Sequence, residues 1–240
     1  TFWASVATSP FDPRLQFDSG SNRWIAVVDA ESRSASSKVC VAISQTANPL
    51  GNWTFYQIDA DATNEFWADF PNLGTNGHWV TITNNMFGVS NNSYGGPKMW
   101  VISKPSLLAG GPLTLSVFDT GFDNTGFFSG STLVPTTGDS GNAMFILDNF
   151  WFNNVTFVPQ IRLSRLTGTA AAPVWQEVIN PASADPFFDV PIPFSFNVFE
   201  ARQAGEPRTI ATNDARLQNA VISNGLITFA HHASPADGDS

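Results

Sequence analysis

The chain has 240 residues, of which 42% are hydrophobic, 13% aromatic and only 13% charged, and its formal net charge is −9. The charged fraction is about half of the ~25% found in average soluble proteins, and no Lys/Arg cluster interleaves with aromatic residues as a phosphate-binding face requires. We therefore expect no nucleic-acid partner. No apolar run approaches the ~18 residues of a membrane span, so we expect no membrane span either.

Short runs rich in β-branched and aromatic residues follow one another along the chain, each interrupted by Gly, Pro, Asn or Asp. No apolar period of 3.6 residues persists for three turns, so the sequence predicts an all-β protein and no helix. The runs group in fours: 14–18, 23–29, 38–46 and 53–58; then 72–74, 78–83, 98–103 and 113–118; then 131–135, 143–152, 156–166 and 174–179. Two further runs, 216–223 and 226–231, begin a fourth set.

The grouping is supported by an internal repeat. Asp12, Arg14, Leu15 and Gln16 recur in the same order and spacing as Asp214, Arg216, Leu217 and Gln218, and a looser version contains Asp69, Pro71 and Leu73. Units of about 40 to 60 residues with four strands each are typical of β-propeller blades. A β-sandwich with fortuitous similarity between two strands is the alternative.

The predicted organisation is a single β-propeller region over 1–240. Its blades cover about 13–59, 70–119 and 131–180, a partial blade covers 215–232, and 181–214 is an excursion between blades. Three and a half blades leave an open sheet edge, which invites pairing with another strand. Thr1 to Ala7 is one candidate for completing the last blade; a second protein chain is another, and the chain as a fragment of a longer propeller is the interpretation we prefer.

Several phrases carry a resemblance to known proteins: those around Asp12, 23–28, 44–49, Trp53, 69–74 and 214–218. They resemble a group of largely uncharacterised secreted bacterial β-propeller proteins. The resemblance implies the propeller fold and a secreted, extracellular or cell-surface location, and it brings no established activity. The chain lacks the repeated Ser, Asp and Trp box of sialidase propellers.

The first strand of each propeller blade lines the central channel, so residues at its start converge on the channel mouth. Asp12, Asp69 and Asp214 hold that position. Converging carboxylates suit a hard cation such as Ca²⁺, which would make these three residues metal ligands, or acid and base catalysis on a glycosidic bond. In the alternative interpretation each Asp caps a local turn and no cofactor is bound.

Other side chains are candidates for ligand contact. Arg14 and Arg216 either clamp an anionic ligand or pair with the Asp two residues earlier. His78 is a candidate helper near the channel, and Trp67 is the most interesting exposed aromatic residue because it is close to Asp69; Trp3 and Trp151 are also expected to be exposed. Cys40 lies in an apolar run and is expected to be a buried structural thiol.

Two functions fit these patterns. The favoured one is an extracellular module that binds a glycan or a protein, or a structural part of a cell-surface or filamentous assembly. The alternative is a secreted carbohydrate-active hydrolase or lyase that uses the carboxylates at the channel. The two differ in whether the aspartates approach one another in an open pocket, as the carboxyl pair of a glycosidase must.

Overall fold

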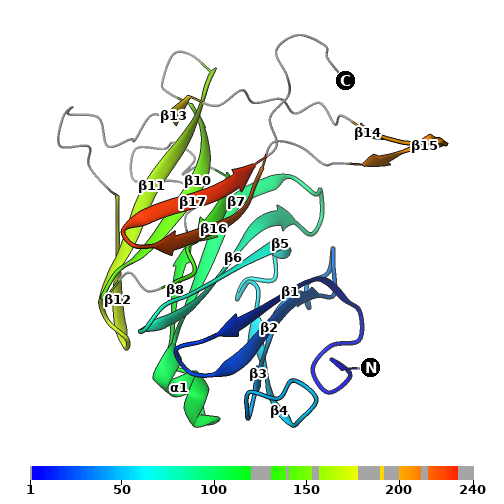
Figure 1. The fold of residues 1–240 in the computed structure, drawn as a ribbon. Helices are drawn as coiled ribbons and strands as arrows, with labels where there is room; N and C mark the ends of the chain where they lie inside the picture. Colours follow the sequence, from blue (N-terminus) through cyan, green and yellow to red (C-terminus); the bar gives the residue numbers. More distant parts are fainter. Residues whose placement is uncertain are drawn as a thin grey trace.

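A computed structural model describes residues 2–119, 131–138, 141–152, 157–177, 190–191, 200–211 and 216–231. Apart from one short helix, the regular elements in these ranges are strands (Figure 1). The all-β prediction is confirmed. Within the described ranges, no helix has the length and apolar character needed to cross a membrane.

Three antiparallel sheets each contain four strands in chain order, β1-β2-β3-β4, β5-β6-β7-β8 and β9-β10-β11-β12. The strand bounds in the first two sheets are β1 Pro10–Asp18, β2 Arg23–Ala30, β3 Lys38–Ser44, β4 Trp53–Asp59, β5 Phe66–Thr75, β6 Trp79–Gly88, β7 Tyr94–Ser103 and β8 Leu115–Asp119. Those in the third are β9 Ser131–Pro135, β10 Met144–Phe152, β11 Phe157–Thr169 and β12 Ala172–Glu177. Each sheet is therefore one meander of the kind that forms a propeller blade.

The C-terminal part contributes shorter pieces. β13 (Val190–Pro191) pairs with β11, while β14 (Glu200–Gln203) and β15 (Glu206–Ala211) form a separate hairpin. β16 (Leu217–Ser223) and β17 (Leu226–His231) form a two-stranded sheet. Among the described residues the fourth blade thus has two strands where the others have four.

The sheets are arranged as propeller blades. The first strands β1, β5, β9 and β16 all contribute side chains to one cavity, and Figure 1 shows β5 between β1 and β16. In a sandwich two sheets enclose one core, whereas here the second sheet packs on the first through one apolar cluster and on the third through another. The predicted β-propeller is confirmed, in partial form.

Apolar layers between blades form the core. Val27 and Val41 of the first blade pack with Ile82 and Trp100 of the second in one buried cluster. A second cluster joins Trp79 and Met99 to Met144 and Ile146 of the third blade. The central strands are covered on both faces. Nearly all residues of β2, β3 and β6 are therefore buried, and buried residues do not alternate with exposed ones along these strands.

The expectation that the chain has no helix is wrong. Helix α1 (Lys104–Ala109) follows β7, with Pro105 in its first turn and Gly110 ending it in the left-handed conformation at φ 73°. Its six residues are too few to produce a recognisable 3.6-residue period. Leu107 nevertheless anchors the helix in the core between the first two blades.

The N-terminal segment does not complete the last blade. Trp3, Val6 and Ala7 pack against Val28 and Cys40 of the first blade. Cys40 is fully buried, as predicted, and burial raises the pKa of its thiol to about 11. Apolar contact with its own blade is the nearest way for this segment to leave water.

Candidate functional site

The first strands of the three complete blades share one irregularity. Asp12 and Pro13 of β1 lie opposite the single residue Val28, because Phe11 pairs with Asp29 and Arg14 pairs with Val27. The same two-against-one pairing places Phe70 and Pro71 opposite Asn84, and Thr132 and Leu133 opposite Asp148. Each is a β-bulge, and bulges re-aim side chains at the rims of sheets and at active sites.

The first residue of each bulge is in the left-handed conformation, with φ of 50° at Asp12, 63° at Phe70 and 57° at Thr132. Glycine is absent from all three positions, although only glycine adopts this conformation without cost. Proline follows twice, at a point where a strand can spare its N–H. The bulges also show that Asp12 is structurally equivalent to Phe70. The looser sequence repeat, which aligned Asp69 with Asp12, is therefore shifted by one residue at this position.

The bulges bring three carboxyl groups into electrostatic contact. Asp12 is exposed and Asp69 is half-buried. Burial raises the pKa of Asp69, and the negative charge of Asp12 raises it further, while Arg216 acts in the opposite direction. Both residues lie within strands, and the Asp69 carboxylate accepts a hydrogen bond from the backbone of Phe70. The structure thus places Asp12 and Asp69 within electrostatic reach of each other, and the role of each stays a prediction.

The third carboxyl group belongs to Asp29, the β2 residue opposite Phe11. It is fully buried, and burial together with the charge of Asp69 raises its pKa well above the ordinary value. Its Oδ1 accepts a hydrogen bond from Asn84 Nδ2 at 3.1 Å, whereas Oδ2 has no partner among the described residues. Burial without a cation at this place favours the neutral form of the carboxyl group over the charged one.

Arg14, Phe70 and Arg216 occupy the same end of the channel. The guanidinium carbons of Arg14 and Arg216 lie 5.3 and 5.0 Å from the centre of the Phe70 ring. Arg14 Nε donates to Pro71 O at 2.7 Å, and a second nitrogen reaches Asn72 Oδ1 at 3.4 Å. The guanidinium is thus turned to the second blade, and it still lies within electrostatic reach of Asp12, whose charge opposes the lowering of the Arg14 pKa by burial. We call Asp12, Asp29, Asp69, Phe70, Arg14 and Arg216 the channel mouth.

The second and third blades extend this polar region. Asp148 is buried and lies directly across from Arg162 in the β10–β11 register. Burial raises the pKa of Tyr94, and the charge of Asp148 contributes in the same direction. Asn85 joins the two blades, since Thr132 N donates to its Oδ1 at 2.9 Å and its Nδ2 donates to Thr132 Oγ1 at 3.1 Å.

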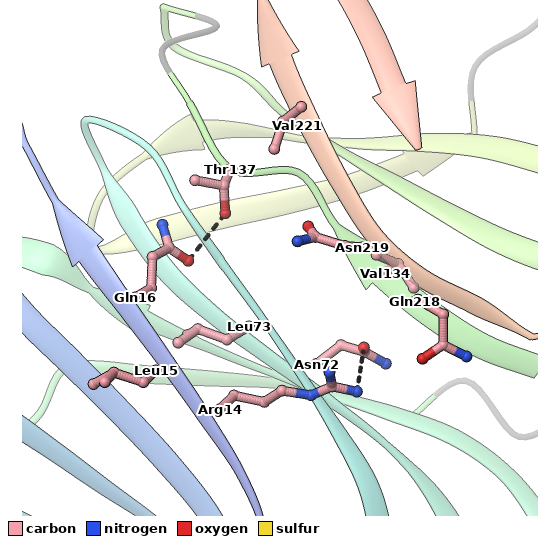
Figure 2. Close-up of a pocket in the computed structure, with 10 residues that line it drawn as sticks. All are labelled: Arg14, Leu15, Gln16, Asn72, Leu73, Val134, Thr137, Gln218, Asn219 and Val221. Atoms are coloured by element: carbon pink, nitrogen blue, oxygen red, sulfur yellow. Dashed lines mark hydrogen bonds between the residues drawn. The ribbon is translucent and has the colours of Figure 1, made fainter. Parts of the chain in front are cut away.

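Beyond the mouth, the first strands enclose a cavity of about 240 Å³ (Figure 2). Arg14 and Asn72 lie at one end, and Gln16 and Thr137 at the other, where Thr137 Oγ1 donates to Gln16 Oε1 at 3.0 Å. Gln16 Nε2 donates to Thr75 at 2.6 Å. The volume is below the roughly 300 Å³ at which drug-sized ligand pockets begin, so the channel itself accepts a small group or water.

The remaining predicted site residues are buried, lie at the other end of β5, or fall outside the described ranges. Trp67 is only 6% exposed and packs on Phe87, so its expected exposure is wrong. His78 lies in the turn after β5, at the end of that strand opposite Asp69, with its ring edge-on to Trp79. Asp214 lies outside the described residues, as do the side chains of 151–160, which include Trp151.

The expected metal site has no counterpart among the described residues. No three His, Cys, Asp or Glu side chains within those ranges are grouped so as to hold an ion. Since Asp214 was one of the three expected ligands and is not described, binding of Ca²⁺ by Asp12, Asp69 and Asp214 stays a prediction.

Sequence reasoning missed Asp29 and Asp148. Both interrupt strongly apolar strands, in the phrases Val27-Val28-Asp29 and Ile146-Leu147-Asp148. The second blade has Asn84 and Asn85 in the corresponding place. The position of Asp29 is polar in the second strand of every complete blade, as Asp29, Asn85 and Asn149, and that recurrence beside the bulge was the available signal.

Comparison with known proteins finds distant structural matches only. No protein-family profile matches the sequence, and no curated protein is similar to it. Among solved structures, an exo-1,5-α-L-arabinanase from a bovine ruminal metagenomic library is 10% identical with a TM-score of 0.41, over 94% of this chain and 79% of the other. The Cellvibrio cellulosa α-L-arabinanase in complex with arabinohexaose is 11% identical with a TM-score of 0.39, over 91% of this chain and 66% of the other. Similarity at this level assigns no activity to the chain.

Proposed function

We propose that the chain is a carbohydrate-active hydrolase that cleaves a glycosidic bond at the channel mouth. The observation that carries the proposal is the pairing of exposed Asp12 with half-buried Asp69, whose pKa is raised by burial and by the charge of Asp12. Glycoside hydrolysis requires two carboxyl groups in different protonation states. Asp69 is the proton donor to the glycosidic oxygen, and Asp12 is the base or nucleophile on the accessible side.

The surroundings favour a sugar substrate. The channel below the carboxylates is lined by neutral amides and a hydroxyl that are held by hydrogen bonds: Thr137 donates to Gln16, and Asn72 donates to the backbone of the third blade. Such a floor keeps the first strands rigid while the substrate lies above it, which is how catalytic side chains are held within the tolerance that catalysis needs. A polymeric carbohydrate also fits the extracellular location that we expect for the protein.

The test compares Asp69→Asn and Asp12→Asn with the unmodified protein on a panel of neutral polysaccharides, including arabinan, by release of reducing ends. Loss of a general acid or base lowers kcat by about 100-fold or more, with a smaller change in KM. Asp119→Asn is the matched control, because that carboxylate lies on the outer strand β8 and is 70% exposed. Activity should fall on the alkaline side as Asp69 loses its proton.

Full activity in both mouth variants would refute the assignment of these residues. If the unmodified protein hydrolyses a polysaccharide and only Asp12→Asn lowers the rate, Asp12 keeps its role as base or nucleophile, and a residue other than Asp69 is the acid. No hydrolysis on any polysaccharide, with binding retained, would favour the second function below.

A binding or assembly module is the second candidate. The observation that favours it is the fourth sheet, in which the outer edge of β17 pairs with no other described strand. An open edge accepts a strand from another chain, and this is a common route to protein recognition. Light scattering on the purified protein would separate a monomer from such an assembly.

A further inference from the structure

A second hollow lies on the first blade, away from the channel mouth. It has a volume of about 530 Å³, within the range of ligand pockets, and is lined by the turn between β3 and β4 and by Phe2. That turn is closed by the pair Ser44 and Trp53, whereas the mouth residue Asp29 pairs with Val39. The two sites are therefore about 17 Å apart along β3, at ~3.4 Å per residue. We call the second one the β3–β4 groove.

One wall of the groove is aromatic. Phe2 is 47% exposed, and its ring centre lies 5.1 Å from that of Trp53, with the rings perpendicular, and 5.0 Å from that of Phe55. Phe55 in turn packs on the buried cluster around Val6 and Cys40. The aromatic wall is thus fixed to the blade and keeps part of its surface in solvent.

The rest of the groove lining is a hydrogen-bonded turn. Trp53 Nε1 donates to Pro49 O at 3.0 Å, Gln45 N donates to Asn52 O at 2.9 Å, and Gly51 N donates to Asn48 O at 3.1 Å. These bonds hold the backbone in place before any ligand arrives, which reduces the entropy lost on binding.

The turn presents Leu50, which is 92% exposed, together with the exposed amide side chains of Gln45 and Asn52. Within the part of the chain that the structure describes, neither of these two side-chain amides has a hydrogen-bond partner. Both are therefore available to donate to a ligand and to accept from it.

We propose that the β3–β4 groove is a docking site for a neutral polysaccharide, separate from the channel mouth. Aromatic and aliphatic walls suit the C–H faces of sugar rings, and two amides that donate and accept suit their hydroxyl groups. The groove has no ionisable side chain in its lining, so nothing in it rewards a charged ligand. The proposal rests on the proposed function only in taking the ligand to be the polymer that the mouth cleaves.

The test is affinity electrophoresis in gels containing the same neutral polysaccharides, with the Asp12→Asn/Asp69→Asn protein as background so that no polymer is cleaved. Phe2→Ala and the double variant Gln45→Ala/Asn52→Ala should each weaken retention by about tenfold. The second variant leaves the aromatic packing intact, so it still reports on the groove if Phe2→Ala unfolds. Leu226→Ser, at the exposed first residue of β17, is the control and should be retained normally.

Retention that is unchanged in both groove variants would overturn the proposal. So would an apolar peptide that quenches Trp53 fluorescence in a groove-dependent way when no polysaccharide retards the protein. Groove-dependent retention without any hydrolysis by the unmodified protein would leave this site in place and refute the proposed activity. Hydrolysis by the unmodified protein without groove-dependent retention would support the proposed activity and overturn the docking site.

Discussion

Asp29 is the residue at which the site departs most from ordinary burial rules. It is fully buried with one oxygen unpartnered among the described residues, whereas the equivalent β6 and β10 positions are Asn85 and Asn149. Those amides bond across to the next blade, Asn149 Oδ1 accepting from Leu217 N at 3.0 Å. A carboxyl group at this place costs stability whenever it is ionised.

Asp29→Asn should therefore become more stable relative to the unmodified protein as the pH rises. A carboxyl group whose pKa is raised on folding contributes stability below its unfolded pKa, and that contribution is lost as the pH rises through the folded pKa. Asparagine keeps the bond from Asn84 and removes the titration. Urea unfolding from about pH 4 to about pH 8 would show the difference in unfolding free energy grow, with Asp119→Asn as the control. A difference that stays constant with pH would contradict the raised pKa.

At the scale of elements, the repeated β-bulge decides where the first strands direct their side chains. All three bulges begin with a non-glycine residue in the left-handed conformation. Such strain is retained where the surrounding structure fixes it, and it concentrates at functional sites. The bulge places Asp12 beside Asp69 even though the two residues are not equivalent in the repeat.

Asp12 offers a direct measurement of that strain. Asp12→Gly and Asp12→Ala both remove the carboxylate, but only glycine relaxes at φ 50°. The glycine variant should exceed the alanine variant in unfolding free energy by about 1 kcal/mol, and both should lose activity. Chemical denaturation measures the first effect and the reducing-end assay the second. Equal stability of the two variants would mean that the bulge is not left-handed in solution.

At the scale of the whole molecule, adjacent blades are joined by polar links as well as by apolar layers. Lys104 Nζ in α1 lies 2.8 Å from Asp18 Oδ2 at the end of β1, and both side chains are more than nine-tenths buried. This ion pair connects the second blade to the first. Its partners come from segments far apart in sequence, so its worth depends on the blades being docked.

Lys104→Met should lower the unfolding free energy by roughly 3 to 5 kcal/mol, because it leaves Asp18 buried without its cation. Adding Asp18→Asn should recover part of the loss. The exposed pair Arg208 and Glu206 in the β14–β15 hairpin is the control, and Arg208→Gln should produce no measurable change. Thermal and urea unfolding test all three. A small effect of Lys104→Met would show that the blades remain docked without the pair.

The sequence by itself determined the all-β class, the succession of strands, the four-stranded units and the burial of Cys40. These features follow from local causes: alternation of side chains along a strand, turn residues that break the runs, and apolar side chains that must leave water. The aspartates at the start of the first strands were also visible, because a repeat of that kind is read directly from residue spacing.

Only the tertiary structure decided which residues share the channel mouth. Asp29 enters it because a bulge in β1 sets its register, and Arg14 turns to Pro71 and Asn72 because the second blade supplies the acceptors. Trp67 is buried, although it is close to Asp69 in sequence, because Phe87 of the next strand covers it. Contacts between blades join residues tens of positions apart, and the local periodicity of a strand contains no information about its neighbour in the next sheet.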